Sequence, residues 1–438
     1  VSVLTLVVML FVSTWHVRTF VVSGPSMAET LLGEHHQLSC GVCGYTFRCD
    51  AEQPEMPGKR AVCPNCGDSQ RRLDLARRLP ADAIMVDRTA FCVRPPGRWE
   101  LAAFRGADRA SQVYVKRIVG LPGEAIELKH GDVYVDGVVQ RKNMAQLRAM
   151  AVLVHDSRYE PASVPSRWLP EAADSGWRQA GSRFRRIARN NSRNETIDWL
   201  TYHHRRRDTD ASNIDDERPI ADDCGYNQTK PVIESHVVRD LMLRCRIRTD
   251  NSPAVSWLIT DGVAQFVVGL DFSSHKASVV QDGRPVGEGD WPSGTAESVL
   301  CELALCDQQV LLAIDKREVL SLPYERPDLP FHPTSRPVAV GTRDPGLEIW
   351  DLVVWRDVYY SSIGRGNGSI QDRLGKDEYF VLGDNSPASL DSRSWSPSGV
   401  AAAHLIGKPI LAWPSRVQSD WRGWQFQVPA ISRLRYIR

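Results

Sequence analysis

Ser26 and Lys116 are the residues of this sequence that together could break a peptide bond. Ser26 follows Gly24, whose missing side chain lets the backbone turn tightly and leaves nearby amide groups accessible. A serine hydroxyl attacks a carbonyl group only when a base removes its proton. Lys116 lies in the apolar stretch Val113–Val119, and burial there would lower the pKa of its amine from the usual value of about 10.4. Taken alone, the same residues also fit a turn serine and a solvated lysine on a strand.

Four cysteines have the spacing of metal ligands. Cys40 and Cys43 form one Cys-x-x-Cys pair, and Cys63 and Cys66 form another after 19 intervening residues. This pattern predicts a zinc ribbon in which four thiolates close the coordination shell and leave no position for a catalytic water. Two disulfides are the alternative if this segment lies outside the cytoplasm. Cys49, between the pairs, could be an extra thiol or a substitute ligand. The scattered cysteines are expected to be buried core residues: Cys92, Cys224, Cys245, Cys301 and Cys306.

An apolar run precedes Ser26 in the chain. Val3–Val17 is almost uninterrupted, and continuing through Phe20–Val22 reaches the length of about 20 residues that spans a bilayer. A cleaved signal peptide would need a basic segment before the run and small residues at its end. The run ends instead in Trp15, His16 and Arg18, which is typical of a membrane interface. We therefore expect a retained transmembrane helix over residues 1–22.

The rest of the sequence favours strands. Ile84–Arg88 and residues 112–120 are apolar stretches bounded by turn residues, and hairpin signals follow them. From residue 235 to 360, short apolar stretches alternate with turn signals such as Asp261-Gly262 and Asp282-Gly283. Many short strands at this spacing predict a β-sandwich resembling jelly rolls. The chain is expected to be mostly β.

The length and charge exclude some classes of protein. A chain of 438 residues is too long for one ordinary core, so two or three domains are expected. The net charge of +1 gives no support to nucleic acid as a partner. Basic residues gather only locally, in Arg183–Arg189 and Arg205–Arg207, which are expected to be solvated faces.

Four motifs in a fixed order carry a family resemblance. They are Gly24-Pro25-Ser26-Met27-x-x-Thr30-Leu31, Asp82–Arg88, Tyr114–Glu124 and Gly383–Arg393. In this order, after an apolar N-terminal segment, they resemble the sequence boxes of type I signal peptidases, also called leader peptidases. The resemblance covers about 1–37, 80–141 and 375–414. It implies a signal-peptidase-like catalytic domain of antiparallel β-sheets.

The resemblance also implies roles for individual residues. Ser26 would be the nucleophile and Lys116 the general base of a Ser-Lys dyad, with Ser389 orienting the lysine amine. Supporting residues would be Asp391 with Arg393 as an ion pair, Asp384 and Arg117 in structural roles, and Gly24. The Ser26 amide would contribute to the oxyanion hole, while Gly24 stands where many members have a hydroxyl. Pockets for small substrate residues would be lined by Ile84, Met85 and Val86. The sequence departs from the family at Glu29, where proline is common, and at Ser386, where arginine is usual.

These expectations divide the chain into an anchor, a catalytic domain in three segments, and two insertions. The expected parts are an anchor (1–22), three catalytic segments (23–37, 71–141 and 375–438, the last with a C-terminal tail), a zinc-ribbon insertion (38–70) and a β-sandwich-like insertion (142–374). Both insertions interrupt connections between the boxes. Such insertions are tolerated because the entropic cost of closing a loop grows only slowly with its length.

The resemblance implies a membrane-bound serine endopeptidase that removes signal peptides from exported preproteins after small residues, at Ala-x-Ala sites. It would sit in the cell (inner or cytoplasmic) membrane on a single span, with the catalytic domain outside the cytoplasm. No cofactor is expected for catalysis, and a structural zinc is expected in the ribbon. Expected partners are preproteins and membrane lipid, with an envelope carbohydrate or a protein for the sandwich. The alternative is a catalytically retired scaffold that binds envelope components. A Ser-Lys peptidase for regulatory self-cleavage would generally be soluble, which the anchor argues against.

Overall fold

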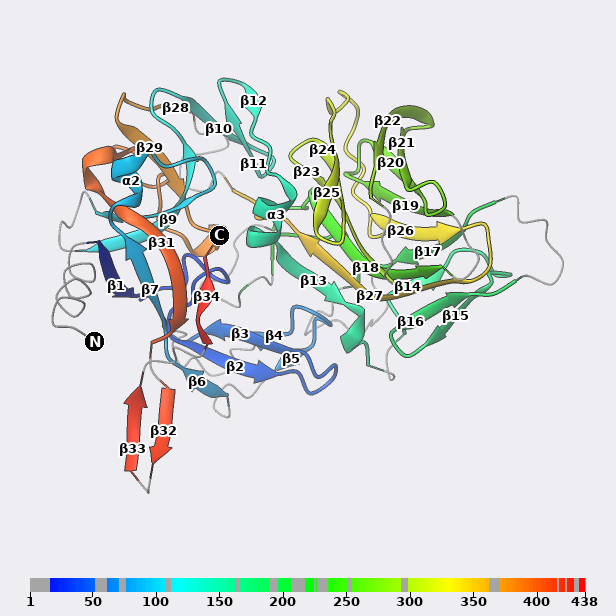
Figure 1. Cartoon of the computed structure of the whole chain (residues 1–438), viewed down its shortest axis with the longest axis horizontal. Coiled ribbons are helices and arrows are strands. Elements are labelled where there is room, and N and C mark those ends of the chain that lie inside the picture. Colours follow the sequence, from blue (N-terminus) through cyan, green and yellow to red (C-terminus); the bar gives the residue numbers. More distant parts are fainter. Residues whose placement is uncertain are drawn as a thin grey trace.

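Strands dominate the structure, which confirms the expected mostly β fold class. The computed structural model describes residues 16–51, 61–70, 76–106, 112–161, 165–188, 196–205, 217–223, 226, 235–249, 254–292, 298–361, 371–415, 417–421, 424–428 and 433–437. Figure 1 shows three parts within these residues: a sheet region at the left, a larger sandwich at the right, and a small ribbon below and between them.

The sheet region joins segments from both ends of the chain. Its eight-stranded sheet has the order β1-β7-β31-β8-β9-β29-β30, with β34 beside β31. The strands are β1 (Val17–Val21), β7 (Asp82–Asp87), β8 (Leu101–Arg105), β9 (Val113–Gly120), β29 (Glu378–Leu382), β30 (Val400–Ala401), β31 (Leu405–Pro414) and β34 (Arg435–Tyr436). A second sheet holds β10 (Ala125–Lys129), β11 (Asp132–Val135), β12 (Val138–Val139) and β28 (Gln371–Arg373). Neighbouring strands are antiparallel. Antiparallel strands can be joined by short connections, and a long insertion can replace such a connection without changing how the strands pair.

The sandwich consists of two sheets around one apolar core, in which Trp257, Phe266 and Leu303 are fully buried. One sheet contains β13 (Val152–Asp156), β15 (Trp177–Ala180), β16 (Arg183–Arg186), β18 (Leu241–Thr249), β23 (Val299–Cys306), β24 (Gln309–Ile314), β25 (Arg317–Pro323) and β27 (Leu347–Arg356). The other contains β14 (Trp168–Pro170), β17 (Asp198–Tyr202), β19 (Ala254–Thr260), β20 (Gln265–Asp271), β21 (Lys276–Gln281), β22 (Arg284–Asp290) and β26 (Val338–Thr342). The alternating burial along β19 and β20 follows from inward-facing apolar residues at every second position.

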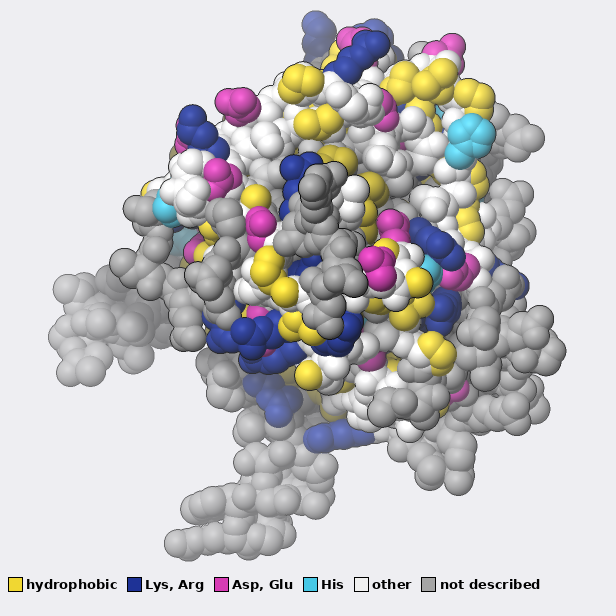
Figure 2. Space-filling view, turned by 90° about the vertical axis from the view of Figure 1, so that its right-hand side faces the viewer, with side chains coloured by type: hydrophobic (Ala, Val, Ile, Leu, Met, Phe, Trp, Pro, Cys, Tyr) yellow, Lys and Arg dark blue, Asp and Glu magenta, His cyan; other side chains and the backbone are white. Residues whose placement is uncertain are grey.

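Charged residues of both signs are spread over the sandwich end of the molecule (Figure 2). Arg183 pairs with Glu348 at 3.3 Å between Nη1 and Oε1, and its guanidinium lies 4.7 Å from the centre of the Trp350 ring. Arg186, expected on a solvated face, is buried and pairs with Asp198 at 2.7 Å. The expectation was wrong at Arg186 because alternate residues of β16 face opposite sides of the sheet.

The ribbon is built from short strands. β2 (His35–Ser39) pairs with both β3 (Thr46–Asp50) and β6 (Arg77–Leu79), and β4 (Ala61–Val62) pairs with β5 (Ser69–Gln70). A separate hairpin, β32 (Val417–Trp421) and β33 (Trp424–Val428), projects from the sheet region at the bottom of Figure 1. The short helices are α2 (Ala90–Val93), α3 (Met144–Met150), η2 (Ser157–Tyr159), η3 (Ser386–Ala388) and η4 (Ala402–His404).

Two expectations need correction. The expected transmembrane helix over 1–22 falls largely on residues 1–15, outside the described part, but its last segment is strand β1, which pairs with β7 over Val17–Val21. Among the described residues, no helix has the length and apolar character needed to cross a membrane. Cys92 was expected in a core and is exposed, because it lies on the four-residue helix α2, which buries no residue. Cys245, Cys301 and Cys306 are buried as expected.

The chain enters and leaves the sandwich at neighbouring points. Lys142, just before α3, lies with its Nζ 2.9 Å from Asp357 Oδ2, just after β27, and 2.7 Å from Asp307 Oδ1. The same amine lies 4.4 Å from the centre of the Trp99 ring, which belongs to the sheet region. Asp240 and Cys306 complete a buried acidic group around this lysine. Lys142 supplies the cation that this group needs, so we do not regard it as a metal site.

Candidate active site

The loop that carries Ser26 is held from two sides. On one side, Met27 and Leu31 are buried in a core shared with Ile84 and Val86 of β7. On the other side, the Ser26 carbonyl accepts a hydrogen bond from the Asn385 amide at 3.1 Å, and the Asn385 side chain donates to the Pro25 carbonyl at 3.0 Å. Ser26 itself is partly exposed. The loop therefore presents the serine to solvent on a fixed backbone.

Lys116 lies on β9 and points to the loop after β29. Its Nζ donates to Ser389 Oγ at 3.0 Å, and its side chain is almost wholly buried. This burial lowers the pKa of Lys116 from 10.5 to about 8, with Asp391 opposing the shift and Arg393 adding to it. A substantial fraction of the amine is therefore neutral near pH 8 and able to accept a proton.

Gly383 is the point at which these segments meet. A Cβ added to this glycine would lie 2.3 Å from Ser389 Oγ and 2.4 Å from the Ser26 carbonyl oxygen. No side chain fits in that space, so the close approach of the two serines depends on glycine. The Ser26 loop and the Lys116 amine thus both adjoin Ser389.

Asp391 and Arg393 form a fully buried ion pair behind Ser389. Arg393 donates to both carboxylate oxygens of Asp391, from Nε and Nη2, each at 2.8 Å. Burial alone would raise the pKa of Asp391, but Arg393 and a hydrogen bond with Ser389 hold this pKa below its ordinary value. Arg393 also donates to Ser386 Oγ at 2.8 Å. The serine stands where arginine is usual in the family, and it places a small hydrogen-bond acceptor beside the Arg393 guanidinium.

Arg117 follows Lys116 on β9, and both side chains are buried on opposite faces of the strand. Arg117 makes two hydrogen bonds to Asp384, at 2.7 Å and 2.6 Å, and a third to the Trp99 carbonyl at 2.6 Å. Thr30 donates to the same carboxylate at 2.5 Å. Asp384 therefore ties the Ser26 loop to the strand that carries the lysine.

The remaining predicted site residues lie nearby with different surroundings. Ile84 and Val86 face the core, and Met85 is partly exposed on the opposite face of β7. Both edges of β7 are paired, with β1 and with β31. Gly24 has open space around the position of an added Cβ. The assignment of the β7 residues to substrate pockets stays a prediction.

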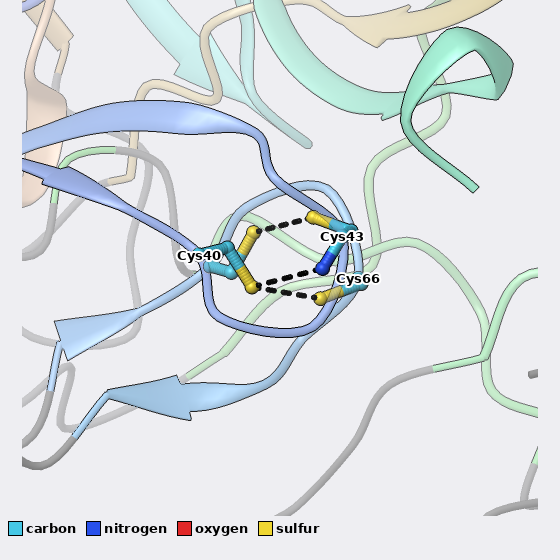
Figure 3. Close-up of side chains that lie close together, drawn as sticks. Cys40, Cys43 and Cys66 are labelled. Carbon is cyan, nitrogen blue, oxygen red and sulfur yellow. Dashed lines mark hydrogen bonds between the residues drawn. The ribbon is translucent and has the colours of Figure 1, made fainter. Parts of the chain in front are cut away.

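The four ribbon cysteines converge on one point. Their sulfur atoms all lie within 4.8 Å of one another, with 3.6 Å from Cys40 to Cys66 and from Cys43 to Cys63. Four thiolates at about 2.3 Å from a zinc ion would be about 3.8 Å apart, so the group fits a tetrahedral metal ion. Figure 3 shows Cys40, Cys43 and Cys66 turned toward each other. Cys49 is buried in the apolar core of the ribbon and is not a member of the group.

The second cysteine knuckle also fastens the ribbon to the sandwich. Asn65, between Cys63 and Cys66, accepts a hydrogen bond from the Asp156 amide at 2.6 Å and donates to the Tyr159 carbonyl at 3.2 Å. Asn65 is fully buried. The roles of Asn65, Gly383 and Lys142 were not predicted from the sequence. Gly383 could have been found as the first residue of the final box, whereas Asn65 and Lys142 carry no local signal.

Comparisons with known proteins identify the family of this chain. The model of the family "Signal peptidase, peptidase S26" matches residues 1–171 and 357–413. The chain belongs to this family. The matched segments contain every predicted catalytic residue, and the unmatched segment, 172–356, contains most of the sandwich.

Curated relatives match over shorter stretches. "Probable signal peptidase I-2" of Synechocystis is 30% identical over 67 residues, 14% of this chain and 31% of that protein. Signal peptidase I of Leptolyngbya laminosa is 25% identical over 92 residues, 19% of this chain and 42% of that protein. The chain thus spans less than half the length of these relatives.

Solved structures align with the chain only loosely. A carbohydrate binding module, CBM66, from Bacillus subtilis has 12% identity and a TM-score of 0.22, and covers 44% of this chain and 94% of that one. A Bacillus subtilis protein of unknown function with a galectin-like fold has 8% identity and a TM-score of 0.30, and covers 47% and 97%.

Proposed function

We propose that this signal peptidase family member is a serine endopeptidase that removes signal peptides from exported preproteins after small residues, at Ala-x-Ala sites. Ser26 is the nucleophile and Lys116 the general base. The observation that carries the proposal is the buried Lys116 amine, with a pKa of about 8, donating to Ser389 at 3.0 Å beside the Ser26 loop. A buried lysine with a lowered pKa and a fixed hydroxyl partner is suited to proton transfer.

The reaction follows from these roles. Lys116 takes the Ser26 proton while Ser26 Oγ attacks the scissile carbonyl carbon, forming a tetrahedral intermediate. The protonated Lys116 then donates this proton to the leaving amine, the peptide bond breaks, and the signal peptide remains as an ester on Ser26. Lys116 next takes a proton from water, which attacks the ester carbonyl, and then returns this proton to Ser26 Oγ as the ester bond breaks and the carboxylate is released.

Neighbouring groups position these reactants. Ser389 orients the lysine amine, and the Asp391–Arg393 ion pair fixes Ser389. The Ser26 amide donates to the developing oxyanion. The open space at Gly24 leaves room for water as a second donor, where many relatives carry a hydroxyl.

The ribbon cysteines are proposed to hold one structural zinc ion. A zinc bound by Cys40, Cys43, Cys63 and Cys66 would cross-link the two knuckles and, through Asn65, brace the end of β13. We further propose that the protein works at the outer surface of the cell membrane, held there by the apolar part of the chain that precedes β1, and meets its preproteins at the lipid surface.

The test is cleavage of a preprotein bearing an Ala-x-Ala site, in detergent micelles, by the full chain and its variants. Ser26→Ala and Lys116→Ala should each lower kcat/KM by about a thousandfold or more. Ser23→Ala, at an exposed serine of the same loop, and Lys129→Ala, at a half-exposed lysine, are matched controls that should keep full activity. Equal cleavage by Ser26→Ala would refute the assignment, and no cleavage by the folded parent chain would favour the scaffold alternative.

A further inference from the structure

A cavity of about 890 Å³ lies where the sheet region, the ribbon and the sandwich meet. Its walls come from the loop Ala28–Thr30, the loop Asp384–Pro387, the ribbon residue Tyr45, helix α3 and strand β13. Figure 1 shows these elements around the middle of the molecule. The volume is in the range of pockets that bind ligands.

The cavity begins at the residues that hold the proposed nucleophile. Ala28 is two residues after Ser26, and Asn385, whose amide binds the Ser26 carbonyl, lines the same wall. The hydrogen bond of 2.5 Å from Thr30 to Asp384 joins the two loops into one surface. The cavity therefore adjoins both loops that hold Ser26, although the serine itself is not among the lining residues.

The lining is aromatic and charged. Six aromatic side chains contribute to it: Tyr45, Tyr159, Tyr226, Trp355, Tyr359 and Tyr436. Acidic and basic side chains, among them Glu29, Arg148 and Asp223, reach the same walls. Aromatic rings give contact area to many kinds of side chain, and charges of both signs suit a polar peptide.

One wall offers backbone groups for an extended chain. Within the described strands, β13 pairs only with β27; on its other edge the ribbon residue Asn65 binds the Asp156 amide, and the Val152–Leu153 part has no partner strand. Val152 and Leu153 of β13 line the cavity. An extended peptide can bind such an edge through main-chain hydrogen bonds, with little demand on its sequence.

We propose that this cavity receives the part of the substrate that follows the cleaved bond, the start of the mature protein, in an extended conformation. This inference rests on the proposed function. The apolar signal peptide is the poorer occupant, because it would strip water from the charged side chains of the walls without replacing their hydrogen bonds. The first residues of an exported, water-soluble protein are polar and can satisfy them.

Both insertions build this site. Tyr45 of the ribbon meets Tyr159 of the sandwich segment edge to face, with 5.1 Å between ring centres, and Asn65 of the ribbon donates to the Tyr159 carbonyl. The ribbon and the sandwich therefore lengthen the surface beside the catalytic sheet to which the substrate binds.

The test compares two substrates that share one signal sequence and one cleavage site. The short substrate ends two residues after the cut, and the long substrate continues for fifteen more residues of the mature protein. The parent chain should cleave the long substrate with a kcat/KM about tenfold higher. Tyr159→Ala combined with Tyr436→Ala, both exposed cavity residues, should remove this preference and leave cleavage of the short substrate within about twofold.

Leu329→Ala, at an exposed apolar residue outside the cavity, is the control and should keep the preference. Equal cleavage of both substrates by the parent would overturn this inference alone, as would an equal loss on both substrates in the cavity variant. If the folded parent chain cleaved neither substrate, the proposed function and this inference would both be overturned.

Discussion

Arg117 and Asp384 form a two-bonded ion pair that is almost wholly shielded from water, with distances of 2.7 Å and 2.6 Å. Arg117 lies beside Lys116 on β9, and Asp384 begins the loop that leads to Ser389. The pair therefore fixes the strand of the proposed base relative to the residue that orients it. Because Thr30 donates to the same carboxylate, the nucleophile loop is held by the same two charges.

Removing one partner should be costly for folding. Asp384→Ala should lower the free energy of unfolding by about 3–5 kcal/mol, because Arg117 would remain charged and buried without its partner. Urea unfolding followed by circular dichroism measures this change. Arg373→Ala, which breaks an exposed pair with Asp136, should cost less than about 1 kcal/mol. A similar decrease in the free energy of unfolding in both variants would show that the Arg117–Asp384 pair stabilises the fold no more than an exposed ion pair does.

The pH dependence of cleavage should follow Lys116. Only the neutral amine can accept the Ser26 proton, so kcat/KM should rise with pH and level off above about pH 8. Asp391 raises the pKa of Lys116, so Asp391→Asn should shift the midpoint of the profile to lower pH. Initial rates on an Ala-x-Ala substrate between pH 5 and 10 would measure both midpoints. A midpoint near the pKa of an unperturbed lysine would contradict burial of the base.

The lowered pKa of Lys116 also predicts that this lysine supports activity but destabilises the fold. The pKa of Lys116 is about 8 in the folded protein and 10.5 ordinarily, so the unfolded chain binds its proton more tightly. Lys116→Met should therefore stabilise the protein at pH 7 by roughly 2–3 kcal/mol while removing activity. The gain is fully present below about pH 8 and declines as pH rises toward 10.5, where the amine is neutral in both states. A destabilised Lys116→Met variant at pH 7 would argue that the lysine is held charged by its neighbours.

Gly383, at the proposed active site, and Gly97, outside it, provide a matched pair of glycines. Gly383→Ala should lower kcat by about a hundredfold or more, because its Cβ would push apart Ser389 and the Ser26 loop. Gly97→Ala meets only ordinary contacts, at 3.6 Å or more from the Glu100 side chain, and should keep kcat within about twofold. Steady-state kinetics with circular dichroism of both variants separates lost geometry from lost folding. Full activity of Gly383→Ala would mean that the loops move apart without harm.

The ribbon should contain one zinc ion per chain, measured by atomic absorption on purified protein. Cys43→Ser should lose the metal and lower the melting temperature, because the knuckle that carries Asn65 would no longer be fixed. Cys49→Ser, at a cysteine outside the metal group, should keep the ion. Absence of metal from the parent protein would favour the disulfide alternative, and retention of the ion by Cys43→Ser would contradict the proposed ligand set.

Sequence alone could predict those parts of the site that lie in continuous motifs. Lys116, Ser389 and the Asp391–Arg393 pair follow from the boxes, because each box places its residues on one strand or one tight loop. The strand at Val17–Val21 could not be predicted, because its apolar residues suit a membrane helix as well as a sheet. Asn65 and Lys142 were missed since their partners are far away in the chain, and no periodicity signals such contacts.

The ion pair between Lys142 and Asp357 has a consequence for how this chain could have arisen. Side chains from the two ends of the sandwich meet, with 2.9 Å between Lys142 Nζ and Asp357 Oδ2, so the chain enters and leaves this module at one place. A recombination event that adds or deletes the module at these positions leaves the flanking strands in register.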